Sequence, residues 1–173
     1  MHWRLRRAGA ADADALAMVA AASFLETFAG VLAGPDIIRH CAANSAPAKF
    51  ATWANDPASV VTLVEHPDGA APVGYTVLTS PDLPIPLGPG DIELRRIYAL
   101  SITRGTGLGA ALMARAITDA RALGMTRMLL GVLGRNHRAR AFYERQSFTL
   151  VGERRFLVGE TWYDDVVYGR DLR

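Results

Sequence analysis

A glycine-rich turn offers the clearest chemistry in the sequence. Its residues are Arg104, Gly105, Thr106, Gly107, Leu108 and Gly109. Glycines in such a turn let backbone N–H groups approach a ligand, and the start of a following helix adds partial positive charge. Both features favour a bound phosphate or pyrophosphate. A tight strand-to-helix connection would also use glycines, so the turn alone leaves both interpretations open.

Two common nucleotide-binding motifs do not account for this turn. Gly105, Gly107 and Ala110 fit the G-x-G-x-x-A pattern of dinucleotide-binding folds, but the turn begins about a hundred residues into the chain. The next apolar strand also ends at Leu133 and Gly134 without the carboxylate that those folds place there. A P-loop requires Gly-Lys-Ser/Thr, which does not follow this turn.

The elements around the turn form one strand–turn–helix–strand unit. The sequence predicts a strand over 91–100 before the turn and a helix over 108–123 after it, because apolar residues recur at helical spacing there. The almost wholly apolar run 127–133 predicts a strand that is covered on both faces. A second helix is expected over 136–145.

The remaining elements complete a single domain of residues 1–173. Residues 80–90 hold four prolines and two glycines, which predicts a loop. Strands are expected over 3–7, 59–65, 72–79, 149–156 and 162–170, and helices over 15–22 and 37–42. The predicted order is therefore β-α-α-β-β-β-α-β-α-β-β.

Composition narrows the class of protein. A chain of 173 residues that is 50% apolar suits one globular domain. Its 19 basic and 17 acidic residues leave a net charge of +2, without the basic stripe of a nucleic-acid binder. Cys41 is the only cysteine, which favours the reducing cytoplasm. No signal peptide, membrane span or metal-ligand pattern is predicted.

Two separate motifs resemble the GCN5-related N-acetyltransferase (GNAT) family. The family's R/Q-x-x-G-x-G/A pattern is met by Arg104, Gly107 and Gly109. Its N-x-x-A-x-x-F-Y-x-x-x-G-F segment is similar to the stretch containing Asn136, Ala139, Ala141, Phe142, Tyr143 and Phe148. The resemblance implies an α/β (α+β) GNAT fold: a mixed, mostly antiparallel sheet with a V-shaped splay between strands 4 and 5 and helices on both faces.

A finer resemblance is to bacterial spermidine/spermine acetyltransferases of the PaiA type. It rests on residues 23–28, 92–100, 129–136 and 139–148. It implies an enzyme that acetylates a small-molecule amine, with a polyamine as one candidate, and the excess of Arg over Lys separately indicates a bacterial source. In one departure, Ser147 stands where the family usually has Gly and must adopt a geometry that Gly adopts freely. In another, Gly131 stands where the ribosomal-protein N-terminal acetylases carry a Glu base.

The resemblance also implies where the cosubstrate acetyl-CoA binds. Backbone amides of residues 104–109 would hold its pyrophosphate, and Asn136 would meet the pantetheine arm or nearby backbone. Amides of Tyr98 or Ala99, next to Ile97, would polarise the thioester carbonyl. Three arginines are candidates either for the adenosine 3′-phosphate or for a solvated helix face: Arg138, Arg140 and Arg145.

For acetyl transfer to an amine, the protonated amine must first lose a proton. An alkylamine has a pKa of about 10 and a thiol of about 8.5, so freeing the amine is the steeper requirement. Glu93 is the candidate base, on the opposite side of its strand from Arg96 and Tyr98 by simple alternation. Its alternative role is an ion pair with Arg95. Tyr143 is the candidate acid, because the family places this tyrosine beside the sulfur; its alternative role is core packing.

The sequence says least about the identity of the acceptor substrate. Glu26 and Asp36 could attract a cationic amine. Trp162 and Tyr163 could pack in the core or form a homodimer contact, and the alternative is a cage for an amine. The leading hypothesis is acetylation of a small amine. The alternatives are an antibiotic- or toxin-modifying acetyltransferase of the same fold, or a non-catalytic CoA-binding regulatory module.

Overall fold

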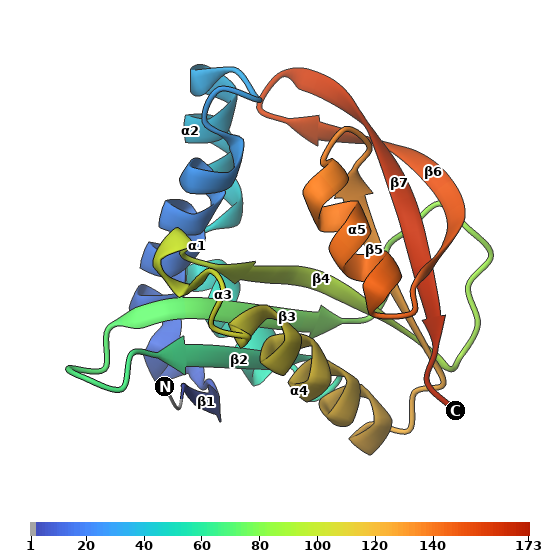
Figure 1. The fold of residues 1–173 in the computed structure, drawn as a ribbon, viewed down its shortest axis with the longest axis horizontal. Helices are drawn as coiled ribbons and strands as arrows, with labels where there is room; N and C mark the ends of the chain where they lie inside the picture. Colours follow the sequence, from blue (N-terminus) through green and yellow to red (C-terminus); the bar gives the residue numbers. More distant parts are fainter. Residues whose placement is uncertain (1–2) are drawn as a thin grey trace.

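The computed structural model describes residues 3–173 as one sheet with helices packed on it (Figure 1). The strands are β1 (Arg4–Arg7), β2 (Val60–Glu65), β3 (Pro72–Thr79), β4 (Asp91–Ala99), β5 (Arg127–Leu133), β6 (Thr149–Val158) and β7 (Thr161–Asp171). The helices are α1 (Ala13–Phe28), α2 (Gly34–Asn44), α3 (Pro47–Asn55), α4 (Leu108–Ala122) and α5 (His137–Arg145), with short 3-10 turns η1 (Ala10–Asp12) and η2 (Ser101–Thr103).

The expected elements are present, and α3 is the one α-helix among residues 3–173 that the sequence analysis missed. It has nine residues and buries only Phe50 fully, so it is too short to show an apolar repeat. Pro47 at its start reads in the sequence as part of a loop, although proline is well suited to the first turn of a helix.

The seven strands lie in the order β1-β2-β3-β4-β5-β7-β6. Every neighbouring pair is antiparallel except β4 and β5, which run parallel. That parallel pair is joined only where residues 91–93 face residues 127–129. Beyond this point β4 continues along β3 while β5 continues along β7. The predicted mixed sheet and its V-shaped splay are therefore confirmed.

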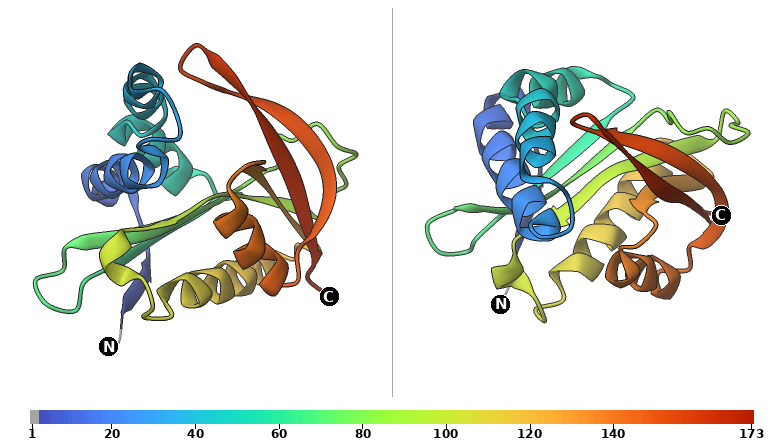
Figure 2. Two further views of the ribbon diagram at one scale, coloured as in Figure 1. Left: turned by 45° about the horizontal axis from the view of Figure 1, so that its top comes forward. Right: turned by 90° about the horizontal axis from the view of Figure 1, so that it is seen from above.

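Helices cover both faces of the sheet (Figure 2). Side chains on one face of β4 and β5, such as Ile92 and Met128, form a core with α4 and α5. Side chains on the other face of β2 and β3, such as Leu63 and Tyr75, pack under α1 and α3. The splay thus opens between two helical layers. No helix in the part of the chain that the structure describes is long and apolar enough to cross a membrane.

A β-bulge in β4 changes which side chains share a face. The register between β3 and β4 shifts so that Arg95 is an extra residue with no partner. Leu94 packs toward α4, so Glu93 faces the other way, toward the layer of α1 and α3. Tyr98 also packs under α1, and Arg96 lies over aromatic rings of α3. The expectation that Glu93 lies opposite Arg96 and Tyr98 is wrong, because simple alternation does not survive the bulge.

Candidate active site

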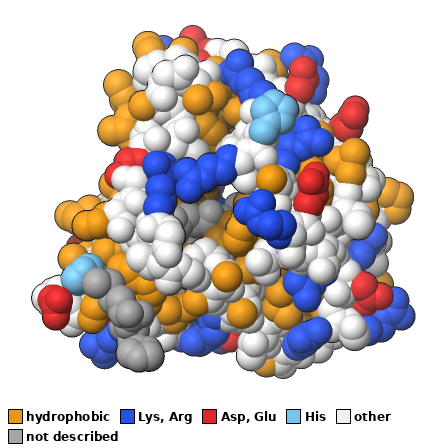
Figure 3. Space-filling model, viewed as in Figure 1, with side chains coloured by type: hydrophobic (Ala, Val, Ile, Leu, Met, Phe, Trp, Pro, Cys, Tyr) orange, Lys and Arg blue, Asp and Glu red, His pale blue; other side chains and the backbone are white. Residues whose placement is uncertain are grey.

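A cavity of about 680 Å³ occupies the splay between β4 and β5. Its walls come from α1, α2, α3, the start of α4, α5, and the β6–β7 hairpin. Figure 3, viewed as in Figure 1, shows a hollow near the centre of the molecule with Lys and Arg side chains around it. The parting of the strands therefore creates space that reaches from one helical layer to the other.

The glycine-rich turn presents free backbone amides at one end of this cavity. Gly105 and Gly107 have φ of 75° and 82°, and a side chain on either would meet open space. Within residues 3–173 nothing accepts a hydrogen bond from the N–H of Gly105, Gly107 or Gly109. The amides of Arg104 and Thr106 instead donate to the carbonyl oxygens of Ser101 and Thr103 in η2. These open amides at the start of α4 fit a pyrophosphate.

Thr106 differs from the other five residues of the turn because its side chain points away from the cavity. Its Oγ1 accepts a hydrogen bond from Trp3 Nε1 at 3.0 Å and donates to Thr103 O at 2.6 Å. The remaining residues of the turn all line the cavity. Thr106 therefore ties the turn to Trp3, just before β1, whereas its neighbours face the space where phosphates would lie.

The arginines of α5 separate into two roles. Arg138 and Arg145 line the cavity together with Arg104 of the turn. Arg140 instead donates to Tyr168 Oη at 3.1 Å and to Gly134 O at 2.9 Å. Arg104, Arg138 and Arg145 thus line the same cavity as the turn, whereas Arg140 stabilises the packing of α5 on β7.

The splayed edge of β4 exposes two backbone donors. Leu100 N–H donates to Val73 O on β3 at 2.8 Å. Because every second residue of a strand points its N–H to the same side, Tyr98 N–H also faces β3. The N–H groups of Ile97 and Ala99 then face the gap toward β5. Of the two amides predicted to polarise a carbonyl, Ala99 is the one available, and Tyr98 lines the cavity with its ring.

Asn136 and Tyr143 reach the cavity from α5. Asn136 Oδ1 accepts the N–H of Ala139 at 3.2 Å and so caps the helix while lining the cavity. Tyr143 is only 8% exposed and packs edge-to-face on Phe148, but it also lines the cavity. Burial raises the pKa of Tyr143, so the hydroxyl keeps its proton at neutral pH. Core packing and the role of an acid are therefore compatible.

Glu93 sits at the closed corner of the splay. Its Oε2 accepts hydrogen bonds from Arg95 Nη2 at 3.0 Å and from Asp82 N–H at 2.9 Å. Burial nonetheless raises the pKa of Glu93, against the opposing effect of the Arg95 charge. The ion pair with Arg95 exists, and the same carboxylate lines the cavity, as a base would need to.

A second buried carboxylate in the cavity was missed by the sequence analysis. Arg154 donates from Nε and Nη2 to Asp165 Oδ2 at 3.2 and 3.1 Å, and burial raises the pKa of Asp165. The guanidinium lies over Gly131, in the space that a side chain there would fill. Gly131 was the only signal, since a glycine within a strand marks a close approach of another group. An arginine now occupies the place of the missing Glu.

The two acids suggested for an amine have structural partners. Both oxygens of Glu26 accept from Ser101, from its N–H at 2.7 Å and its Oγ at 3.0 Å, although Glu26 also lines the cavity. Asp36 accepts from Glu160 N–H at 3.1 Å and from Thr161 Oγ1, which joins α2 to the β6–β7 turn. Asp36 therefore stands outside the cavity.

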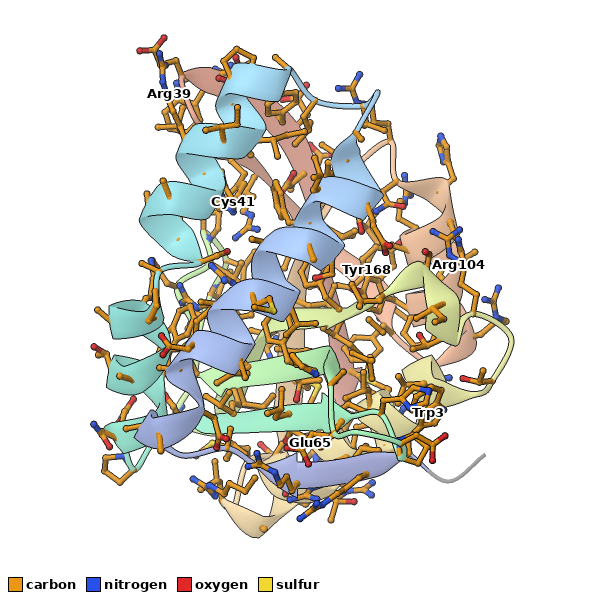
Figure 4. The ribbon with its side chains drawn as sticks, turned by 90° about the vertical axis from the view of Figure 1, so that its left-hand side faces the viewer. Trp3, Arg39, Cys41, Glu65, Arg104 and Tyr168 are labelled. Carbon is orange, nitrogen blue, oxygen red and sulfur yellow. The ribbon has the colours of Figure 1, made fainter. Side chains whose placement is uncertain are left out.

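Cys41 lies on α2 (Figure 4) and packs with aromatic residues of α1 and the β6–β7 hairpin. It is half-buried, and burial raises the pKa of its thiol, which disfavours the reactive thiolate. This environment agrees with a packing role for the single cysteine.

Known proteins share both the sequence pattern and the fold. The acetyltransferase (GNAT) family matches residues 35–148. An uncharacterised N-acetyltransferase of Mycobacterium tuberculosis is 36% identical over 161 residues, covering 93% of this chain and 98% of the relative. The mycothiol acetyltransferase of Beutenbergia cavernae is 39% identical over 103 residues, which are 58% of this chain and 31% of that protein.

Two solved structures show the same fold with a bound nucleotide. The PaiA N-acetyltransferase of Thermoplasma acidophilum in complex with coenzyme A has a TM-score of 0.80 at 16% identity, covering 99% of each chain. The yncA protein of Salmonella typhimurium, a putative acetyltransferase with its cofactor acetyl-CoA, has a TM-score of 0.68 at 19% identity and covers 100% of this chain and 95% of its own.

The fold and the splayed cavity are those of an acyltransferase that uses acetyl-CoA. The chain belongs to the acetyltransferase (GNAT) family. The family, the fold, the class of enzyme and the cosubstrate predicted from the two motifs are therefore confirmed.

Proposed function

We propose that the protein transfers the acetyl group of acetyl-CoA to a primary amine of a small molecule, by direct attack within a ternary complex. One observation carries the proposal: a single cavity is lined by the turn with free amides, by Tyr143 and by Glu93. A donor bound from the turn and an acceptor entering from the α2 and α3 side would meet at the splay.

The chain supplies groups to hold and orient the donor. The amides of Gly105, Gly107 and Gly109 hold the pyrophosphate, with Arg104 beside them. Asn136 keeps its amide group at the cavity wall, next to the pantetheine arm. The N–H of Ala99 donates to the carbonyl oxygen as that oxygen becomes negative. When bound, acetyl-CoA supplies an acetyl group already activated as a thioester.

Two side chains handle protons on opposite sides of the reaction. Glu93 accepts a proton from the ammonium group through a water, and its raised pKa makes it a stronger base than an exposed carboxylate. Tyr143 keeps a proton on Oη and donates it to the departing sulfur. Asp165 is the second carboxylate in reach of the same space, and its pKa is likewise raised by burial.

A panel of amines tests this proposal. Release of free thiol from acetyl-CoA is measured with polyamines, amino acids and amine-containing antibiotics, together with calorimetry of CoA binding. Turnover with a small amine supports the proposal, and turnover with antibiotics alone would favour a drug-modifying enzyme. CoA binding with no turnover on any amine would favour a regulatory module. A cytoplasmic location and a homodimer stay predictions of the sequence.

A further inference from the structure

The cavity has an end that the donor would not fill, next to α2 and α3, which lie beside α1 on this side of the sheet (Figure 4). We call it the acceptor end. The charged residues that line it are Lys49, Arg95, Arg96, Arg154, Glu93 and Asp165, and His40 and Asn44 lie beside them. Lys49 is the only lysine in the sequence, and it lies here. Four cations therefore share this space with two carboxylates.

The two carboxylates are already paired. Glu93 binds Arg95 at 3.0 Å, and Asp165 binds Arg154 at 3.1 Å. Across residues 3–173 no carboxylate comes within ion-pair distance of the other cations, Lys49 and Arg96. Two positive charges at the acceptor end are thus left without a compensating negative charge.

Lys49 and His40 are oriented by one amide. Lys49 Nζ donates to Asn44 Oδ1 at 3.0 Å, so the Nδ2 of Asn44 faces His40. His40 Nδ1 lies 3.3 Å from that Nδ2 and must accept, which leaves the proton of the neutral ring on Nε2. Burial, together with the charges of Arg96 and Lys49, lowers the pKa of His40 to about 4. The site therefore resists a further positive charge.

Arg96 is held in place without being neutralised. It donates to the carbonyl oxygen of Asn44 at 2.6 Å, and its guanidinium lies 5.0 Å from the ring centre of Trp53 and 5.6 Å from that of Phe50. These contacts fix a planar group of donors at the cavity wall. A guanidinium fixed in this way is suited to binding a carboxylate through two parallel hydrogen bonds.

We propose that the acceptor carries a carboxylate besides its amine, and that Arg96 and Lys49 bind this carboxylate while the amine points toward the splay. That the bound molecule is an acceptor rests on the proposed function. That the site binds a carboxylate does not. A polyamine would place added positive charge beside two uncompensated cations. The site thus selects amino acids or similar zwitterions over the polyamines that the sequence resemblance suggested.

Binding measurements test the anion site without turnover. Calorimetry on the CoA-bound protein compares glutarate, a dicarboxylate, with putrescine, a diamine. Glutarate should bind the parent, and Arg96→Gln should weaken its binding about tenfold or more. Arg96 also donates to the carbonyl oxygen of Asn44, so its replacement could disturb the local structure. Lys49→Gln is therefore measured as a second variant and should also lower the affinity for glutarate. Arg115→Gln is the control, since Arg115 pairs with Asp119 on α4 and stands outside the cavity.

Turnover measurements test the acceptor. 4-Aminobutyrate, butylamine and putrescine share a four-carbon chain and differ at the far end, which is a carboxylate, a methyl or an ammonium group. The kcat/KM for 4-aminobutyrate should exceed that for putrescine about tenfold or more, and Lys49→Gln should reduce this preference.

The two sets of results separate the two proposals. Absent glutarate binding, tighter binding of putrescine than of glutarate, or a kcat/KM for putrescine above that for 4-aminobutyrate would overturn the anion site while acetyl transfer stands. Glutarate binding that depends on Arg96 and Lys49, combined with no thiol release from any amine, would uphold the anion site and overturn acetyl transfer.

Discussion

The Glu93→Gln variant should lose activity at neutral pH and regain it as the pH rises. Gln keeps the size of the side chain and can still accept from Arg95 and Asp82, so the local hydrogen bonds survive. What it loses is the ability to take a proton. The carboxylate it replaces has a side chain only 5% exposed, at the corner of the splay, with a pKa raised by burial.

The size of the effect follows from the amine. With an alkylamine pKa of about 10, about one molecule in a thousand is unprotonated at pH 7. The parent removes the proton after binding, so its kcat/KM stays level above the pKa of Glu93. The variant depends on free amine already in solution, and its kcat/KM rises about tenfold per pH unit. The ratio of parent to variant should be about 10³ at pH 7 and about 10 at pH 9, in the range of general base catalysis.

Asp91→Asn provides a matched control. Asp91 lies two residues earlier on β4, is equally buried at 5%, and pairs with Arg127 at 2.6 Å, but it does not line the cavity. Hydrogen bonds from Arg127 lower the pKa of Asp91, so this carboxylate stabilises the fold above the unfolded pKa of about 3.9 and loses that effect as the pH falls through the lowered value. Asp91→Asn should lower Tm at pH 7, by less in acid, and leave the shape of the rate profile unchanged.

The assay is thiol release at saturating acetyl-CoA and low amine, from pH 6 to pH 10. A Glu93→Gln profile that runs parallel to that of the parent, with a lower Tm, would refute the base assignment and leave Glu93 as the partner of Arg95. Asp165→Asn would then be the next variant, because Asp165 is the other buried carboxylate in the cavity. Glu26 would follow it.

Three further variants and one control probe the donor site and the backbone. Tyr143→Phe should keep CoA affinity within a few fold and lower kcat about 10²-fold. This is the low end for acid catalysis, because a thiolate can leave partly unaided. An unchanged kcat would mean that Tyr143 has only a packing role. Gly107→Val should weaken CoA binding in calorimetry and also lower Tm, whereas Gly124→Val, with a similar φ of 77° at the other end of α4, should lower Tm alone. Ser147→Gly should raise Tm by about 2–4 °C, because Ser147 has a φ of 64° and a left-handed residue other than Gly costs about 1 kcal/mol; an unchanged Tm would show no such strain.

Local patterns in the sequence were sufficient to select residues of the proposed donor site that the structure gathers around one cavity. The motif residues Arg104, Gly107 and Gly109 stand within six positions of one another, and their conformation depends on the turn and the helix that follows it. The same holds for Asn136 and Tyr143, which one short helix carries to the cavity. Even the left-handed geometry of Ser147 was expected from its place at the end of that helix, and the structure confirms it.

The acceptor half depends on contacts between distant segments. The bulge at Arg95 reverses the face that alternation assigns to Glu93, and a bulge leaves no reliable mark in one sequence. Arg96 of β4 meets Asn44 across 52 positions, and Lys49 comes from a helix too short to recognise. The sequence by itself determined the family, the sheet and the donor turn, because short-range spacing encodes them. Only the tertiary structure decided which charged side chains meet next to α2 and α3. The packing of distant segments, not the spacing of residues in the sequence, sets the sign of the charge at the acceptor end.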